Sequence, residues 1–178
     1  SHALGSWTLA IPEFEVKLET GRHIFYHADA AQTFRTRLNE QEIGLKTIDG
    51  YRDAEIDTFI EEMLSAADAP ELLVGVHQVA GRALAIAYQH HIDDTCPIAD
   101  VPTIRALKRA LVDHEPMLAW AEAGIAAYID GGVDENRLAA WRWHLQDLLK
   151  SIGGVSGADP RSNPPVELRS AVKPYERN

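Results

Sequence analysis

Histidines are the residues of this chain whose type and spacing point most directly to chemistry. The 178-residue sequence contains eight of them, and Glu19, His23 and His27 follow one another at intervals of four. In a helix this interval places side chains on one face, which is how a single helix offers several ligands to one metal ion. Neutral imidazoles, helped by a carboxylate, are ligands that suit transition metals.

His114 occupies the best-defined core position of any polar residue in the sequence. It belongs to a series of mostly apolar residues at alternating intervals of three and four, which predicts the buried face of a helix. The series is Ile104, Leu107, Leu111, His114, Leu118, Ala121, Ile125 and Tyr128. We therefore expect His114 to lie in the middle of a helix and to face the core.

The height of each histidine along its helix axis indicates which of them could lie at the same level as His114. A helix rises about 1.5 Å per residue, so in a bundle of alternating helices His23, His27, His77 and His114 fall at heights of about 16, 22, 22 and 18 Å. His91 lies about 21 Å from His77 along the same helix and cannot share its site. A reversed direction for the short helix before residue 71 would exchange His77 for His91, and the sequence leaves both assignments open.

Two interpretations of this level of the bundle, at which the histidines lie at similar heights, remain. In the first, Glu19, His23, His27, His77 and His114 form a metal site for Fe, Zn or Mn, with Glu19 as a further ligand or a proton acceptor. In the second, each imidazole donates a hydrogen bond to a carboxylate or a backbone carbonyl, and the level is structural.

The composition limits the classes of protein to which the chain can belong. With 46% hydrophobic residues it can bury one sizeable core. Its net charge of -10 and scattered basic residues argue against nucleic acid or an anionic membrane as partner. No apolar run reaches the roughly 20 residues that span a bilayer. A single cysteine, Cys96, excludes an internal disulfide and fits a cytoplasmic location.

All the secondary-structure elements that position these residues are predicted to be helices. Apolar periodicity and Pro/Gly punctuation predict helices over about 12–42, 53–67, 71–92, 102–131 and 134–152, with turns between them and no strand. Residues 1–152 are expected to form one all-α domain, and the Pro- and Gly-rich residues 153–178 an extended arm. Cys96 and the tryptophans at 120, 141 and 143 are expected to be buried, and Pro116 to kink its helix.

Three runs of this sequence resemble helices three and four of small bacterial ferritin-like proteins. They are Tyr88-Gln89-His90-His91, Ala99-Asp100-Val101-Pro102-Thr103 and the run from Asp113 to Trp120. The resemblance covers roughly residues 12–152 and implies a ferritin-like four-helix bundle with one short extra helix. Members with a di-iron centre carry Glu on two helices and Glu-x-x-His on two others. Here the corresponding place reads His114-Glu115-Pro116-Met117, so a mononuclear His-rich site or a metal-free pocket is expected instead.

These observations lead to three functional hypotheses. The first is a cytoplasmic, homodimeric, metal-dependent oxidoreductase that acts on a small molecule. The second is a metal-free ferritin-like scaffold or interaction module without catalytic activity, dimerising through a helix face or the arm. The third is a bundle whose three-histidine metal site handles thiol adducts.

Overall fold

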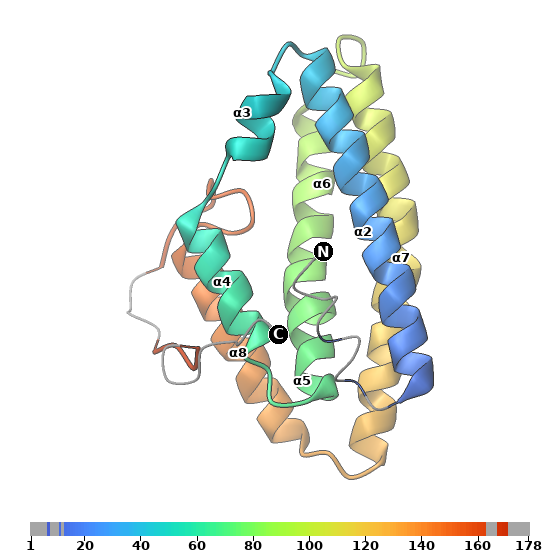
Figure 1. The fold of residues 1–178 in the computed structure, drawn as a ribbon. Coiled ribbons are helices and arrows are strands. Elements are labelled where there is room, and N and C mark those ends of the chain that lie inside the picture. The colour runs from blue at the N-terminus through green and yellow to red at the C-terminus, as the bar shows by residue number, and fades with distance from the viewer. Residues whose placement is uncertain (1–6, 8–10, 12, 163–166, 171–178) are drawn as a thin grey trace. The chain divides into compact units, whose positions relative to one another are not determined.

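The chain is helical in every regular element that the structure describes. The computed structural model describes residues 7, 11, 13–162 and 167–170, so Pro12 and four residues of the arm at 163–166 lie outside it, as do residues 171–178. The helices are α2 (Phe14–Glu40), α3 (Leu45–Gly50), α4 (Ala54–Leu64), α5 (Ala69–Leu73), η1 (Val74–Gly81), α6 (Arg82–Asp94), α7 (Val101–Asp130) and α8 (Glu135–Ser151), as Figure 1 shows. Over the described residues this confirms the all-α prediction.

Helices α7 and α8 begin within one residue of their predicted starts because each is capped by a nearby side chain. Oδ1 of Asp100 accepts a hydrogen bond from the backbone N–H of Thr103 at 3.2 Å, at the start of α7. Asp134 caps α8 in the same way through Asn136 at 2.9 Å. Such caps satisfy backbone donors that have no partner within the helix. Gly132, with φ of +98°, adopts the left-handed conformation just after α7.

The short helix α3 lies between the predicted helices over 12–42 and 53–67, where only a turn was expected. The backbone N–H groups of Thr47 and Ile48 donate to the carbonyl of Gly44, and Arg35 of α2 holds Asp49 through two hydrogen bonds of 2.8 Å. An apolar period cannot be recognised over six residues, so the prediction missed this element.

The predicted helix over 71–92 exists, but its middle is wound more widely than an α-helix. Residues Val74–Gly81 form the π-helix η1 between α5 and α6. Gly75 lies within it, and a Cβ there would come 2.7 Å from Cγ of Met63 in α4 and 3.1 Å from Cδ1 of Leu145 in α8. Glycine thus permits the close approach of both helices. Heights along the helix axis that are calculated at about 1.5 Å per residue apply to an α-helix and are not valid across this segment.

Two compact units make up the chain, and each draws on segments that are distant in sequence. The first comprises Ser1–Asp53 and Ala85–Pro116, and the second Ala54–Leu84 and Met117–Asn178. Helices α6 and α7 each contribute to both units. In α7 the division follows Pro116, which lacks the N–H needed for a helical hydrogen bond.

In the first unit α2 lies along the initial part of α7 (Figure 1), where paired side chains join the two helices. Arg37 donates to Oδ1 of Asp100 and to Oγ1 of Thr103, both at 2.9 Å. Further along, Arg109 meets Asp29 at 2.9 Å. Phe34 packs edge-on against Tyr88 of α6, with ring centroids 5.4 Å apart.

The second unit packs α4 and α8 against α5 and η1 around a core that includes Phe59, Leu72, Leu145 and Leu148. Trp141 of α8 is only 3% exposed, as expected, and its indole N–H donates to the carbonyl of Glu71 at 3.1 Å.

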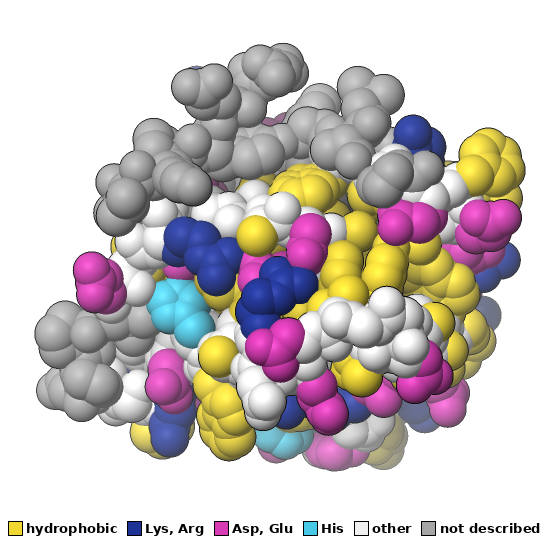
Figure 2. Space-filling model, turned by 90° about the horizontal axis from the view of Figure 1, so that it is seen from below, with side chains coloured by type: hydrophobic (Ala, Val, Ile, Leu, Met, Phe, Trp, Pro, Cys, Tyr) yellow, Lys and Arg dark blue, Asp and Glu magenta, His cyan; other side chains and the backbone are white. Residues whose placement is uncertain are grey.

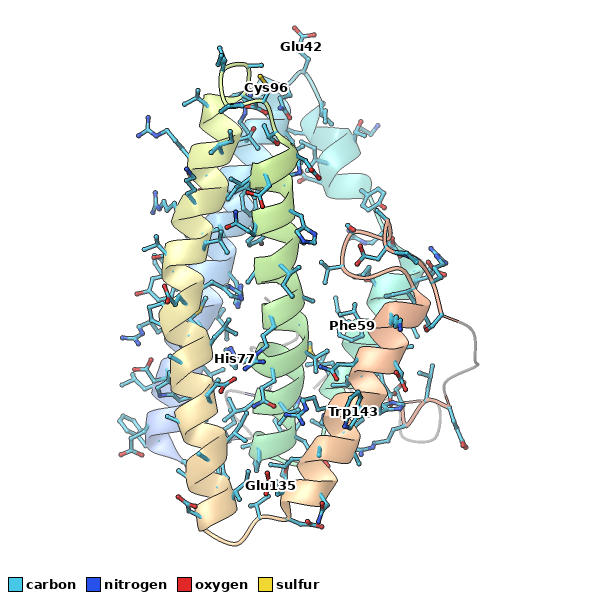
Figure 3. The ribbon with its side chains drawn as sticks, turned by 180° about the vertical axis from the view of Figure 1, so that it is seen from behind. Glu42, Phe59, His77, Cys96, Glu135 and Trp143 are labelled. Carbon is cyan, nitrogen blue, oxygen red and sulfur yellow. The ribbon has the colours of Figure 1, made fainter. Side chains whose placement is uncertain are left out.

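Two expectations about buried residues are wrong. Trp143 on α8 is 62% exposed, because it stands two positions beyond Trp141 and so about 200° around the helix (Figure 3). Cys96 is also exposed, in the loop between α6 and α7 (Figure 3), rather than a small buried side chain.

Within the described residues, no helix combines the length and apolar character that crossing a membrane requires.

Candidate functional site

Three of the predicted histidines gather in the first unit. Helix α2 supplies His23 and His27, and α7 supplies His114. The rings of His27 and His114 meet edge to face with centroids 5.5 Å apart. His23 is 2% exposed and His114 4% exposed, so the interior placement predicted for His114 is confirmed.

Burial keeps two of these imidazoles neutral. It lowers the pKa of His23 to about 4, and the positive charge of Arg22 and the neighbouring imidazoles of His27 and His114 act in the same direction. The pKa of His27 is likewise lowered to about 4, by burial and then by His114. At neutral pH both rings are uncharged, which is the form in which imidazole binds a metal ion.

Glu19 lies beside this cluster on the preceding turn of α2. Its Oε2 is 3.8 Å from Nε2 of His23 and 2.6 Å from the guanidinium of Arg22. The carboxylate is therefore bound to an exposed arginine and only approaches the imidazole. Turning it toward His23 would require breaking a surface ion pair, which is a small cost.

His77 belongs to the second unit. It lies on η1 (Figure 3), is buried, and meets Trp120 edge to face with centroids 6.2 Å apart. The alternative residue, His91, is exposed near the end of α6. The structure thus brings His23, His27 and His114 together within one unit, and describes His77 in the other beside an aromatic ring.

The histidine cluster is not arranged as a finished metal site. Among the residues that the structure describes, no group of three or more His, Cys, Asp or Glu side chains is placed to hold a metal ion. The chemistry of the donors nevertheless fits one, because imidazoles from two helices converge and the two on α2 are neutral. Ligation by all three would require their rings to rotate.

A second polar cluster, which the sequence analysis missed, lies in the second unit around two buried carboxylates. Glu62 of α4 is fully buried and Glu71 of α5 is 1% exposed. Glu62 meets Nε2 of His144 at 2.6 Å and accepts the backbone N–H groups of Arg169 at 2.8 Å and Ser170 at 2.7 Å. Burial alone would raise the pKa of Glu62, but the hydrogen bonds from Ser170, Arg169 and His144 outweigh it and lower the pKa.

Glu71 is held from two sides by arginines. Its Oε1 accepts from Arg137 at 2.9 Å, and its Oε2 accepts from Arg169 at 2.6 Å and from the N–H of Ala67 at 2.8 Å. Arg137 also binds Asp68 at 2.7 Å. The two arginine side chains are about a third exposed, so this network reaches the surface.

Trp141 joins the two carboxylates into one site. The guanidinium of Arg169 lies 4.0 Å from the centroid of the Trp141 ring, and the ring of His144 stacks on Trp141 at 5.3 Å. A cavity of about 510 Å³ opens beside these side chains. Its lining consists of Arg137, Ala140, Trp141, His144, Glu167, Leu168 and Arg169.

Little in the sequence could have revealed this second cluster. The one available signal of a buried carboxylate was Glu62, an acidic residue next to the apolar stripe of α4. Its arm partners lie more than 100 positions away, and no periodicity links an extended segment to a helix.

Searches against protein-family models, curated proteins and solved structures find no match to this chain. The ferritin-like resemblance therefore stays a prediction.

Proposed function

We propose that the first unit binds a transition metal ion, Fe, Zn or Mn, through His23, His27 and His114. The observation that carries this proposal is the convergence of three imidazoles from two helices in one unit, two of them with a pKa of about 4. Neutral imidazole is the ligand form, so no proton has to be removed from these two rings at neutral pH.

The spacing of the rings supports the proposal. With metal-to-nitrogen distances of about 2.0–2.1 Å and a tetrahedral angle, two ligating imidazoles have centroids about 5 Å apart. His27 and His114 lie 5.5 Å apart. Rotation about their side-chain torsions, rather than movement of α2 against α7, is then sufficient to share an ion.

The other parts of the functional hypothesis, which are the role of Glu19, the ferritin-like framework and the reaction, are proposed together with the binding of this ion. Glu19 is proposed as an added ligand or proton acceptor once it leaves Arg22. A ferritin-like bundle is the proposed framework. A bound ion with an open coordination position would be the centre for the metal-assisted oxidation of a small molecule.

Metal analysis tests the proposal directly. The untagged chain is purified, incubated with Fe, Zn or Mn ions in turn, desalted and measured by mass spectrometry for metal. We expect close to one equivalent of one metal in the wild type, and a loss of at least tenfold in affinity in His114→Leu and His27→Leu. His91→Leu, which changes an exposed histidine of α6, is the matched control. Less than a tenth of an equivalent of every metal in the folded wild type would overturn the proposal.

A metal-free interaction module is the second candidate, and the surface of α2 favours it. Phe14, Leu18 and Phe25 recur on one face of the helix and are 70%, 62% and 64% exposed. Exposed apolar side chains in a row are typical of a protein interface. Under this hypothesis the chain is a homodimer through α2, and Phe25→Ser shifts sedimentation toward the monomer, whereas Trp143→Ser, which changes an equally exposed ring on α8, does not. A wild type that stays monomeric at high concentration would contradict it.

A further inference from the structure

Residues 167–170 are bound to the second unit as a peptide ligand is bound to a receptor. Two consecutive backbone N–H groups, of Arg169 and Ser170, each donate to a different oxygen of Glu62. The side chain of Arg169 enters the site separately and bonds to Glu71. Backbone and side chain are thus recognised by different carboxylates.

The recognition of the Arg169 side chain suits a guanidinium in particular. One of its nitrogens donates to a carboxylate oxygen of Glu71 at 2.6 Å, while its Cζ lies over the Trp141 ring, 4.0 Å from the centroid. A planar guanidinium can lay its face on an indole and donate hydrogen bonds from its edge at the same time, whereas an ammonium group is a compact charge with no flat face to stack.

The pocket is largely built without the bound segment. Arg137 holds one oxygen of Glu71 and also binds Asp68, and His144 holds Glu62 while it stacks on Trp141. These groups all belong to α4, α5, α8 and the turn before α5. A peptide would meet carboxylates that are already oriented, which reduces the entropy lost on binding.

Charge explains why the pocket needs a cation. Glu62, Glu71 and Asp68 are three acidic groups, of which the first two are buried. From the helices of the unit, Arg137 pairs with Glu71 and Asp68, and His144 with Glu62. Burial of carboxylates is costly unless opposite charge accompanies them. Arg169 provides the second guanidinium, and Figure 2 shows a face on which basic, acidic and histidine side chains lie side by side.

We propose that this pocket is an arginine-recognition site, that residues 167–170 are its internal occupant, and that an extended, arginine-bearing segment of another protein chain can replace them. Arg161 anchors the chain to Glu55 of α4 through two hydrogen bonds of 2.8 Å, and this attachment does not involve the contacts that residues 167–170 make with Glu62 and Glu71. This inference does not depend on metal binding in the first unit.

Competition between the internal and an added segment tests the proposal. The probe is a fluorescein-labelled, capped peptide Glu-Leu-Arg-Ser, the sequence of residues 167–170, and binding is measured by fluorescence anisotropy with the full chain. A tethered segment competes at an effective concentration of the order of millimolar. We therefore expect the Arg169→Ala chain to bind the peptide at least tenfold more tightly than the wild type does.

Two controls make the result specific. A peptide in which neutral citrulline replaces arginine has the same shape without the charge, and it should bind Arg169→Ala at least tenfold more weakly. Glu71→Gln in the same background should lose the preference for arginine over citrulline. The Arg169→Lys chain keeps the cation but not the planar stack, so it remains testable if Arg169→Ala does not fold.

The outcomes are distinct. Preferential binding of the arginine peptide to either folded variant supports the proposal. So does a concentration-dependent dimer of the wild type that the arginine peptide dissociates, in which case the second segment comes from another copy of the chain. Equal affinity for the arginine and citrulline peptides, or no binding by a folded variant, would overturn it and leave the segment a purely structural part of the unit.

Discussion

Acid should destabilise this protein well above the pH at which ordinary carboxylates titrate, and His23 is a principal reason. In the folded chain its pKa is about 4, against 6.5 in an unfolded chain. Above pH 6.5 both states hold the neutral ring, so its contribution to stability is fully present. As the pH falls below 6.5 the unfolded state gains a proton that the folded state does not accept until about pH 4, and stability is lost over that window.

The magnitude follows from the same two values. Each pKa unit of difference corresponds to 1.36 kcal/mol, so the complete loss for His23 is about 3 kcal/mol. By pH 5 about 2 kcal/mol of this has been lost, because the unfolded state is then almost fully protonated. His27, with a pKa also near 4, adds a loss in the same direction. The expected decrease is therefore a large fraction of the stability of a typical domain.

Urea unfolding followed by circular dichroism at several pH values between 7.5 and 5 measures this loss. His23→Gln should remove about 2 kcal/mol of the pH dependence over that range. His91→Gln, at an exposed position of α6, should leave the pH dependence unchanged. NMR titration of the His23 ring gives the pKa itself. A ring that titrates near pH 6.5, or a His23→Gln variant with the same pH dependence as the wild type, would refute the reasoning.

Other predictions use matched pairs of residues. Gly75→Ala places a Cβ 2.7 Å from a methionine side chain of α4 and should lower the unfolding free energy by about 1–3 kcal/mol, whereas Gly21→Ala, with no such neighbour within 4 Å, should raise it by up to about 1 kcal/mol. Thermal melting compares the two, and equal effects would contradict the packing described for η1. Trp141→Ala should cost about 3–5 kcal/mol and Trp143→Ala less than about 0.5 kcal/mol, since one ring is buried and the other exposed. The Cys96 thiol, whose pKa is lowered by backbone N–H groups of Ile98 and Ala99, should react fully with a disulfide reagent in the native protein. Reaction only after unfolding would show that it is covered.

The features that were predictable from the sequence are those governed by local chemistry. Helices α7 and α8 begin within one residue of the predicted starts at 102 and 134, because Asp100 and Asp134 cap them through contacts within one turn. His114 is buried because its position in an apolar series determines the face of the helix. In contrast, the wide winding of η1 accompanies the contact of Gly75 with α4 and α8, and no local pattern encodes such a contact.

The candidate site was only partly predictable for the same reason. The interval between His23 and His27 places both on one face of α2, and the apolar series directs His114 inward, so both statements rest on helical period. His77 was grouped with these residues by a height calculated with the rise of an α-helix, but it lies in a segment that is a π-helix. The buried Glu62 and its amide partners from residues 169 and 170 depend on long-range docking, which periodicity does not describe.

The division of the chain into two units has a consequence for biosynthesis. The polypeptide crosses between the units after residues 53, 84 and 116, so neither unit is a continuous stretch of sequence. On the ribosome the first unit stays incomplete until Pro116 has emerged, by which time residues 54–84 of the second have been synthesised and must wait for α8. Domains that are continuous in sequence can fold one after another during translation, but this chain cannot. Its early segments expose apolar surface for the several seconds that the remaining residues take to be made. A single break within residues 54–116 would divide both units at once, because each unit has segments on either side of it.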